Sequence, residues 1–183
     1  MYTDIMIDIE TSSTKYNACV LTIGAIAFNL FNPNIPRVSF ECLINKDDSD
    51  LLGFHTCENT LAWWDKQPDK SRKRAFDDGP RMTVKESVES LSTFCNKYPV
   101  VRYWAQGINF DYVILESLYE KVNVSVPWKF YKLRDSRTIQ HIFSNIKIEM
   151  SNEHDAVSDC HNQISMLINV YKRLKLIKND ILI

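Results

Sequence analysis

Three features are missing from this sequence of 183 residues, and each absence excludes a class of protein. No run approaches the roughly 18 apolar residues that a membrane span needs, so we expect a soluble, cytoplasmic protein without a membrane partner. The five cysteines are widely spread with no C-x-x-C pair, which predicts reduced, mostly buried thiols and no disulfide framework or zinc site. The formal net charge of -1 argues against broad neutralisation of nucleic-acid phosphates, although it permits a short, local grip.

The length and the 45% hydrophobic content are those of a single globular domain, which we take to span residues 1–183. Segments of strand character, listed in chain order, are DIMIDIE (4–10), VLTIGAIAFNL (20–30), RVSFECLIN (37–45), VVRYWAQ (100–106) and WKFYKL (128–133). Turn residues between the first three predict antiparallel connections. We therefore predict an α/β fold with a five-stranded mixed sheet, three antiparallel strands followed by two parallel ones, flanked by helices.

Helical patterns fill the remaining segments. The expected helices are 57–76, interrupted at Pro68; 83–98, with Thr83 as its cap; 110–122; 136–146; and 155–174. The last of these carries apolar residues at spacings of three and four, which indicates a long helix packed along one face.

Two carboxylates alternate with isoleucines in the first strand. Because side chains alternate across a strand, Asp8 and Glu10 share one face, about 6.6 Å apart along the strand. A central strand is covered on both faces, where two unpaired carboxylates are costly and repel each other. We therefore expect a cation between them, at the strand end where α/β sheets bind ligands. An edge position, with both side chains in water, is the alternative.

A second acidic site is Asp111, which follows the fourth strand at the start of a helix. An acidic residue there is favourable to the helix dipole, and this role alone would explain it. Only the neighbouring motifs favour a further role for Asp111.

The third site is the stretch NEHDAVSDC at the start of the last helix. Asn152 or Ser151 can cap this helix, with Asp155 in its first turn. Asp159 lies four residues after Asp155 and borders the apolar stripe, so it again calls for a cation. His154 sits at or just before the first turn.

The order D-x-E, N-x-D and H-x-A-x-x-D is much rarer than any of its parts. It resembles the DEDD (DnaQ-like) 3′-5′ exonuclease superfamily, in the branch with a histidine in the third motif (DEDDh). The motifs match at residues 8–11, at 109–111, and at 154, 156 and 159. The stretches TLAWWDKQ and RDSRTI are similar to the small group of phage exodeoxyribonuclease A and mycobacterial 3′-5′ exoribonucleases. One departure is the short second motif, in which Asn109 lies only two residues before Asp111.

The resemblance implies a ribonuclease H-like fold and a metal-dependent 3′-5′ exonuclease that acts on single-stranded nucleic acid or 3′ overhangs. It implies two Mg²⁺ or Mn²⁺ ions, which stabilise the attacking and leaving oxygens of phosphoryl displacement. Their implied ligands are Asp8, Glu10, Asp111 and Asp159. His154 is the implied general base, because a histidine titrates near neutral pH. The product would be a 5′-mononucleotide, and homodimers are common among similar enzymes.

Candidate substrate contacts flank these motifs. Trp63 and Trp64 are adjacent on a helix and point about 100° apart, so one is expected in the core and the other can stack on a base. The basic run 66–74 lies just downstream of them and would support a grip on a single strand. Thr11, Asn109 and Phe110 are the other candidate contacts, whereas His55, His141 and His161 are more often structural.

Two alternatives stay open. One is a nuclease for very short oligonucleotides or signalling nucleotides, which the low net charge permits. The other is a catalytically silent binding domain on the same fold, although such a domain has no need for costly clustered acids. The motifs display no contact to a 2′-hydroxyl, so the sequence does not distinguish DNA from RNA.

Overall fold

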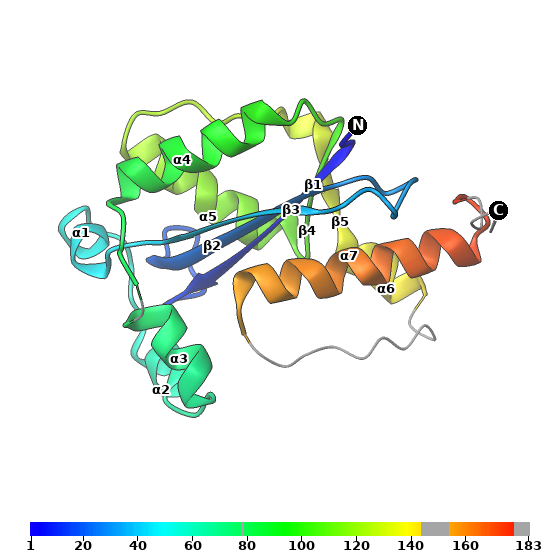
Figure 1. Ribbon diagram of the computed structural model, residues 1–183. Coiled ribbons are helices and arrows are strands. Elements are labelled where there is room, and N and C mark those ends of the chain that lie inside the picture. Colours follow the sequence, from blue (N-terminus) through cyan, green and yellow to red (C-terminus); the bar gives the residue numbers. More distant parts are fainter. Residues whose placement is uncertain (78, 144–153, 178–183) are drawn as a thin grey trace.

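The computed structural model describes residues 1–77, 79–143 and 154–177, and a five-stranded mixed sheet runs through its centre (Figure 1). The strands are β1 (Asp4–Thr11), β2 (Val20–Phe28), β3 (Val38–Leu43), β4 (Arg102–Ala105) and β5 (Leu133–Asp135), in the spatial order β3-β2-β1-β4-β5. β1 pairs antiparallel with β2, and β2 with β3, whereas β1 pairs parallel with β4, and β4 with β5. The predicted fold class is confirmed.

Helices cover both faces of the sheet. They are α1 (Lys46–Leu51), α2 (Glu58–Trp64), α3 (Asp69–Phe76), α4 (Val84–Lys97), α5 (Ile108–Lys121), α6 (Ser136–Ile142) and α7 (Ala156–Arg173). α4 and α5 lie over one face, and α6 and α7 lie over the other (Figure 1). The alternation in β1 follows this division, because Ile5, Ile7 and Ile9 join the core with α4 and α5, whereas Met6 packs with α7.

Most helix boundaries agree with the sequence pattern. Thr83 caps α4 in a capping box with Glu86, and Pro68 separates α2 from α3 as predicted. The prediction for 136–146 is confirmed as far as Ile142; residues 144–146 lie outside the described residues, as do Ser151 and Asn152.

Two elements differ from the expectation. The edge strand was predicted at 128–133, but Phe130–Lys132 forms a 3₁₀ turn and only Leu133–Asp135 pairs with β4. The segment of strand character therefore begins several residues before those that find a partner strand. The short helix α1 was not predicted, because five of its six residues are polar and a single leucine gives no apolar period. Asn45 caps it by accepting hydrogen bonds from the backbone N–H groups of Asp47 and Asp48.

A glycine in β2 sets how closely α7 approaches the sheet. A Cβ at Gly24 would lie 2.5 Å from the carbonyl carbon of Ala156 and 2.7 Å from the backbone nitrogen of Val157. These are backbone atoms at the start of α7, so they cannot rotate away as a side chain would. Gly24 pairs directly with Asp8 across the β1–β2 ladder. The missing side chain therefore lets the start of α7 lie beside the acidic end of β1.

We expect Gly24→Ala to push the start of α7 away from the sheet and to lower the free energy of unfolding by about 1 to 3 kcal/mol, as overpacking does. The nuclease activity that the resemblance implies should also fall in the folded fraction, because His154 and Asp159 both lie at this end of α7. Urea unfolding gives the stability change. Ser39→Ala, at an exposed position of β3, is the matched control and should change stability by less than about 0.5 kcal/mol. An unaltered unfolding midpoint for Gly24→Ala would contradict the close approach.

Candidate active site

A cavity of about 390 Å³ opens beside the C-terminal part of β1. Its wall contains all five residues of the acidic and histidine motifs: Asp8, Glu10, Asp111, His154 and Asp159. β1 supplies the first two, the start of α5 supplies the third, and the entry and first turn of α7 supply the last two. Segments from the beginning, middle and end of the chain thus meet at one place.

The start of α7 is built around Asp155. Its side chain accepts a hydrogen bond of 2.7 Å from the backbone N–H of Ser158, which makes Asp155 the N-cap. The expectation of a cap at Asn152 or Ser151 was therefore wrong. The helix begins at Ala156, one residue later than expected, and Asp159 rather than Asp155 lies in its first turn. His154, directly before the cap, has a φ of 33°, in the left-handed region that few non-glycine residues adopt.

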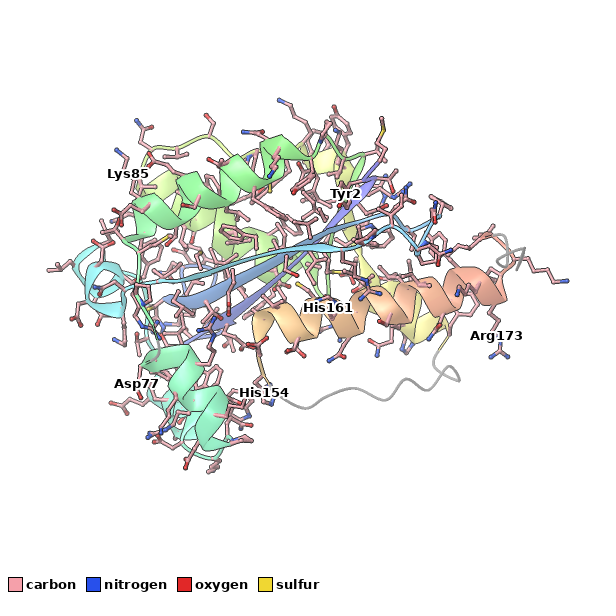
Figure 2. The ribbon with its side chains drawn as sticks, viewed as in Figure 1. Tyr2, Asp77, Lys85, His154, His161 and Arg173 are labelled. Atoms are coloured by element: carbon pink, nitrogen blue, oxygen red, sulfur yellow. The ribbon has the colours of Figure 1, made fainter. Side chains whose placement is uncertain are left out.

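His154 lies between the entry of α7 and the helices α2 and α3 (Figure 2). One donor atom from each of Glu10, His154 and Asp159 falls within 4.8 Å of the other two. Trp63 contacts the imidazole edge to face, with ring centroids 4.8 Å apart. The imidazole is thus held between an aromatic ring and two carboxylates.

The carboxylates of the cavity disfavour one another's ionisation. Burial raises the pKa of Glu10 to about 8, and the nearby charges of Asp159, Asp155 and Asp111 add to the shift. Burial also raises the pKa of Asp8 well above its usual value, with further contributions from Asp111, Glu10 and Asp159. These shifts mark a site that is short of positive charge.

The pKa values of Asp111 and Asp159 are raised as well. Burial raises the pKa of Asp111 to about 7, although backbone hydrogen bonds and the charge of Arg137 oppose the shift. Burial also raises the pKa of Asp159, whereas His154 and a hydrogen bond from Asn162 lower it.

The third carboxylate on β1, that of Asp4, is neutralised by an ion pair and fully hydrogen-bonded. Asp4 is fully buried, yet its two oxygens accept hydrogen bonds from Arg102 at 2.5 and 2.9 Å, and one also accepts from the indole N–H of Trp104 at 2.8 Å. No lysine or arginine within the described ranges forms an ion pair with Asp8, which accepts a 2.8 Å hydrogen bond from the side-chain amide of Gln163. Asp4 is therefore part of a structural ion pair, whereas the lack of such a partner at Asp8 is typical of a ligand-binding site.

A second cavity, of about 520 Å³ and more apolar, adjoins the first. The two share Ile9, Glu10 and Phe110, so the phenyl ring of Phe110 stands at the boundary between them. Trp63 lines the second cavity and keeps 41% of its surface exposed, enough to present its ring to a ligand.

Trp64 is the buried member of the tryptophan pair. Only 1% of its surface is exposed, and its indole N–H donates a 2.9 Å hydrogen bond to the backbone oxygen of Thr11. Its ring belongs to the core, as one of the two tryptophans was expected to. Thr11 is itself buried at the wall of the second cavity, with its hydroxyl donated to the backbone oxygen of Ser13.

Other sequence candidates lie away from the two cavities. Asn109 is exposed on α5 and lines neither cavity, so its role as a substrate contact finds no support in this geometry. The basic run 66–74 is partly neutralised, since Arg72 pairs with Asp65 at 3.2 Å and Arg74 pairs with Glu41. That run therefore offers less free charge than its sequence implied.

The histidines expected to be structural also lie outside the linings. His55 shares a 2.8 Å hydrogen bond with the hydroxyl of Ser13, and His161 lies 3.0 Å from Nη1 of Arg37. His141 is on α6 and lines neither cavity.

Three residues of the cavity wall were missed: Gln106, Arg137 and Gln163. Gln163 had a signal, because it lies four residues after Asp159 and therefore on the same side of α7. Gln106 and Arg137 follow the ends of β4 and β5, and only the parallel pairing of those strands brings them to the cavity.

Comparison with solved structures shows the ribonuclease H-like fold of exonucleases. Escherichia coli exonuclease I in complex with a dT13 oligonucleotide superposes with a TM-score of 0.69 and 16% identity, over 96% of this chain and 42% of that one. This chain thus spans less than half of exonuclease I. The nuclease domain of 3′hExo, a DEDDh family member bound to rAMP, gives 0.68 and 8% identity over 94% and 93% of the two chains. Exonuclease X in complex with 5′ overhanging duplex DNA gives 0.53 and 14% identity over 93% and 92%.

Sequence comparison assigns the family. No curated protein sequence matches the chain. Across the described residues, no helix is long and apolar enough to cross a membrane. The model of the 3′-5′ exoribonuclease Rv2179c-like domain matches residues 3–171, nearly the whole chain, which confirms the predicted DEDDh superfamily. The chain therefore belongs to the Rv2179c-like 3′-5′ exoribonuclease family.

Proposed function

We propose that this protein is a 3′-5′ exonuclease that hydrolyses single-stranded nucleic acid or 3′ overhangs to 5′-mononucleotides with the help of two divalent ions, Mg²⁺ or Mn²⁺. The observation that carries the proposal is the meeting of four carboxylates and one histidine in one cavity, where no basic side chain of the described residues forms an ion pair with Asp8. Buried like charges destabilise a fold unless a cation compensates them. Their retention in one wall supports a metal site.

The donor set fits hard cations. Asp8, Glu10, Asp111 and Asp159 offer carboxylate oxygens, the ligands that Mg²⁺ and Mn²⁺ prefer, and we assign them as the metal ligands. Divalent ions bound there would stabilise the negative charge on the attacking and leaving oxygens of an in-line phosphoryl displacement. Gln163 holds Asp8 in place through its 2.8 Å hydrogen bond and so orients one ligand.

We assign His154 as the general base. Its imidazole lies within 4.8 Å of the carboxylates of Glu10 and Asp159, so it can take the proton of a water molecule beside the scissile phosphate. The water oxygen then bonds to phosphorus as the bond to the upstream 3′ oxygen breaks. That oxygen takes up a proton and leaves with the shortened strand, and the terminal nucleotide leaves with its 5′-phosphate.

We place the terminal base in the second, apolar cavity, against Trp63. Its volume of about 520 Å³ and its apolar lining suit a base, and stacking on an indole ring tolerates any base. Phe110, between the two cavities, would contact the same nucleotide, and Thr11 lies at its wall. The family description favours RNA, while solved neighbours were captured with both dT13 and rAMP. Homodimerisation stays a prediction.

The wild-type protein should shorten a 5′-labelled single strand from its 3′ end, only when Mg²⁺ or Mn²⁺ is present. Asp8→Asn removes a ligand at constant size and should reduce cleavage at least about 100-fold, the upper range for loss of an outer-shell partner. It should also raise the melting temperature of the metal-free protein, because one of several repelling carboxylates becomes neutral. Gel ladders and thermal melts in EDTA measure the two effects.

Asp47→Asn, at an exposed position of α1, is the matched control with the same change in charge and should cleave as the wild type does. Wild-type activity in Asp8→Asn would refute the metal assignment. Mononucleotides released from two- to five-mers alone would instead support the short-oligonucleotide alternative. Matched DNA and RNA strands, digested in parallel, give the sugar preference.

Without metal, we expect stability to fall as pH rises from about 4 to about 8. An unfolded glutamate titrates near pH 4.3, about as an aspartate does, whereas the folded pKa values are about 8 for Glu10 and about 7 for Asp111. Between those limits the folded protein binds more protons, so its free energy of unfolding decreases with pH. Metal competes with these protons, so a fixed Mn²⁺ concentration should raise the melting temperature more at pH 8 than at pH 6. An equal rise at both values would contradict this proton competition.

Trp63→Ala should weaken binding of single strands roughly 5- to 150-fold, from a stacking contribution of about 1 to 3 kcal/mol. Fluorescence anisotropy on the Asp8→Asn background measures binding without cleavage. Trp63→Phe keeps an aromatic face and should lose much less affinity. If both variants bind as the parent does, the base does not stack on Trp63.

A further inference from the structure

The first cavity, which contains the proposed metal ligands, is called the catalytic cavity below. One arginine in its wall has no part in the proposed chemistry. Arg137 is the second residue of α6, directly after β5, and its side chain is exposed. Its Nη2 donates a 2.8 Å hydrogen bond to the backbone oxygen of Gln106. A Cβ at Gly107 would lie 3.4 Å from the same nitrogen, so the glycine leaves room for the guanidinium against the backbone. The charge is thereby held at a fixed place in the wall.

The guanidinium keeps donors to spare. It carries five N–H donors, and the contact with Gln106 is its one side-chain hydrogen bond among the described residues. No carboxylate among the described residues forms an ion pair with Arg137, although its positive charge lowers the pKa of Asp111. Arg137 is also the only lysine or arginine among the described residues that line this cavity.

Its position relative to the apolar cavity gives the site a direction. The two cavities share Ile9, Glu10 and Phe110, whereas Gln106 and Arg137 line the catalytic cavity alone. The apolar cavity therefore adjoins the catalytic cavity at Glu10. The guanidinium of Arg137 lines a part of the catalytic cavity outside this shared wall. A strand with its last base in the apolar cavity and its scissile phosphate at the carboxylates would continue toward this part.

We propose that Arg137 binds the phosphate one nucleotide upstream of the scissile phosphate, and so fixes which linkage lies at the carboxylates. This inference rests on the proposed function. A guanidinium matches the geometry of phosphate oxygens and can bind two of them at once. The contact is to the backbone and therefore independent of base identity. Such a contact explains how a protein with a net charge of -1 can bind a nucleic-acid strand, because one positive charge is held beside the carboxylates.

Single-turnover release of the last nucleotide from two ten-residue single strands tests the contact. In one strand all linkages are phosphates, and in the other the second linkage from the 3′ end is an uncharged methylphosphonate. Wild-type protein should release the last nucleotide from the all-phosphate strand roughly tenfold faster at subsaturating protein, the scale of one hydrogen bond to a charged group. In Arg137→Ala this ratio should fall to about one, and Arg137→Lys should give an intermediate ratio.

The ratio cancels any general defect in folding or metal binding, because both strands meet the same protein. Arg134→Ala is the matched control: Arg134 is exposed on β5, its Nη1 donates to the backbone oxygens of Tyr131 and Leu133, and it does not line the cavity. It should keep the wild-type ratio. A methylphosphonate at the fifth linkage should slow no variant.

Salt dependence gives a second readout that a structural role would not change. Loss of one phosphate contact should reduce the slope of log affinity against log salt by about 0.7 in Arg137→Ala. A wild-type ratio in Arg137→Ala would overturn the assignment of Arg137 while leaving the exonuclease intact. Failure of the wild type to release a nucleotide from the all-phosphate strand would overturn the proposed function and this inference together.

Discussion

The repulsion among carboxylates at one end of β1 is the constraint around which this structure is organised. Asp4 and Asp8 lie on the same strand, yet in the part of the chain that the structure describes only Asp4 has an arginine to neutralise it. Asp8 and Glu10 lie buried beside Asp111 and Asp159, and the repulsion among these carboxylates lowers the stability of the folded protein. Sheet pairing, the packing of α7 and the hydrogen bond from Gln163 keep these groups from moving apart. The proposed metal ions would supply the positive charge that this arrangement lacks.

Much of this site could be predicted because its parts follow local rules. Strand alternation placed Asp8 and Glu10 on one face, and helical spacing placed Asp159 at the edge of an apolar stripe. The chain order of the motifs indicated that they meet. The position of Asp155 was wrong by one residue, because helix caps depend on backbone geometry that the residue type leaves open.

What could not be predicted depends on long-range contacts. Trp63 and Trp64 look equivalent in the sequence, and only the packing of α2 against Thr11 decides which one is buried. Arg137 reaches the cavity because β5 pairs with β4, in a segment where the expected strand was displaced toward the N-terminus by several residues. Gly24 did have a signal, since a glycine inside an apolar strand often marks a close backbone approach.

The hydrogen bond from Trp64 to Thr11 has a consequence for the reach of the site. Thr11 follows Glu10 directly, so α2, with Trp63 on it, is attached to the strand that carries two of the proposed metal ligands. The separation between Trp63 and the two carboxylates of β1 is therefore set within one short part of the fold. With the terminal base placed against Trp63 as proposed, this attachment would hold the stacking ring at a fixed distance from the carboxylates where the scissile phosphate would lie.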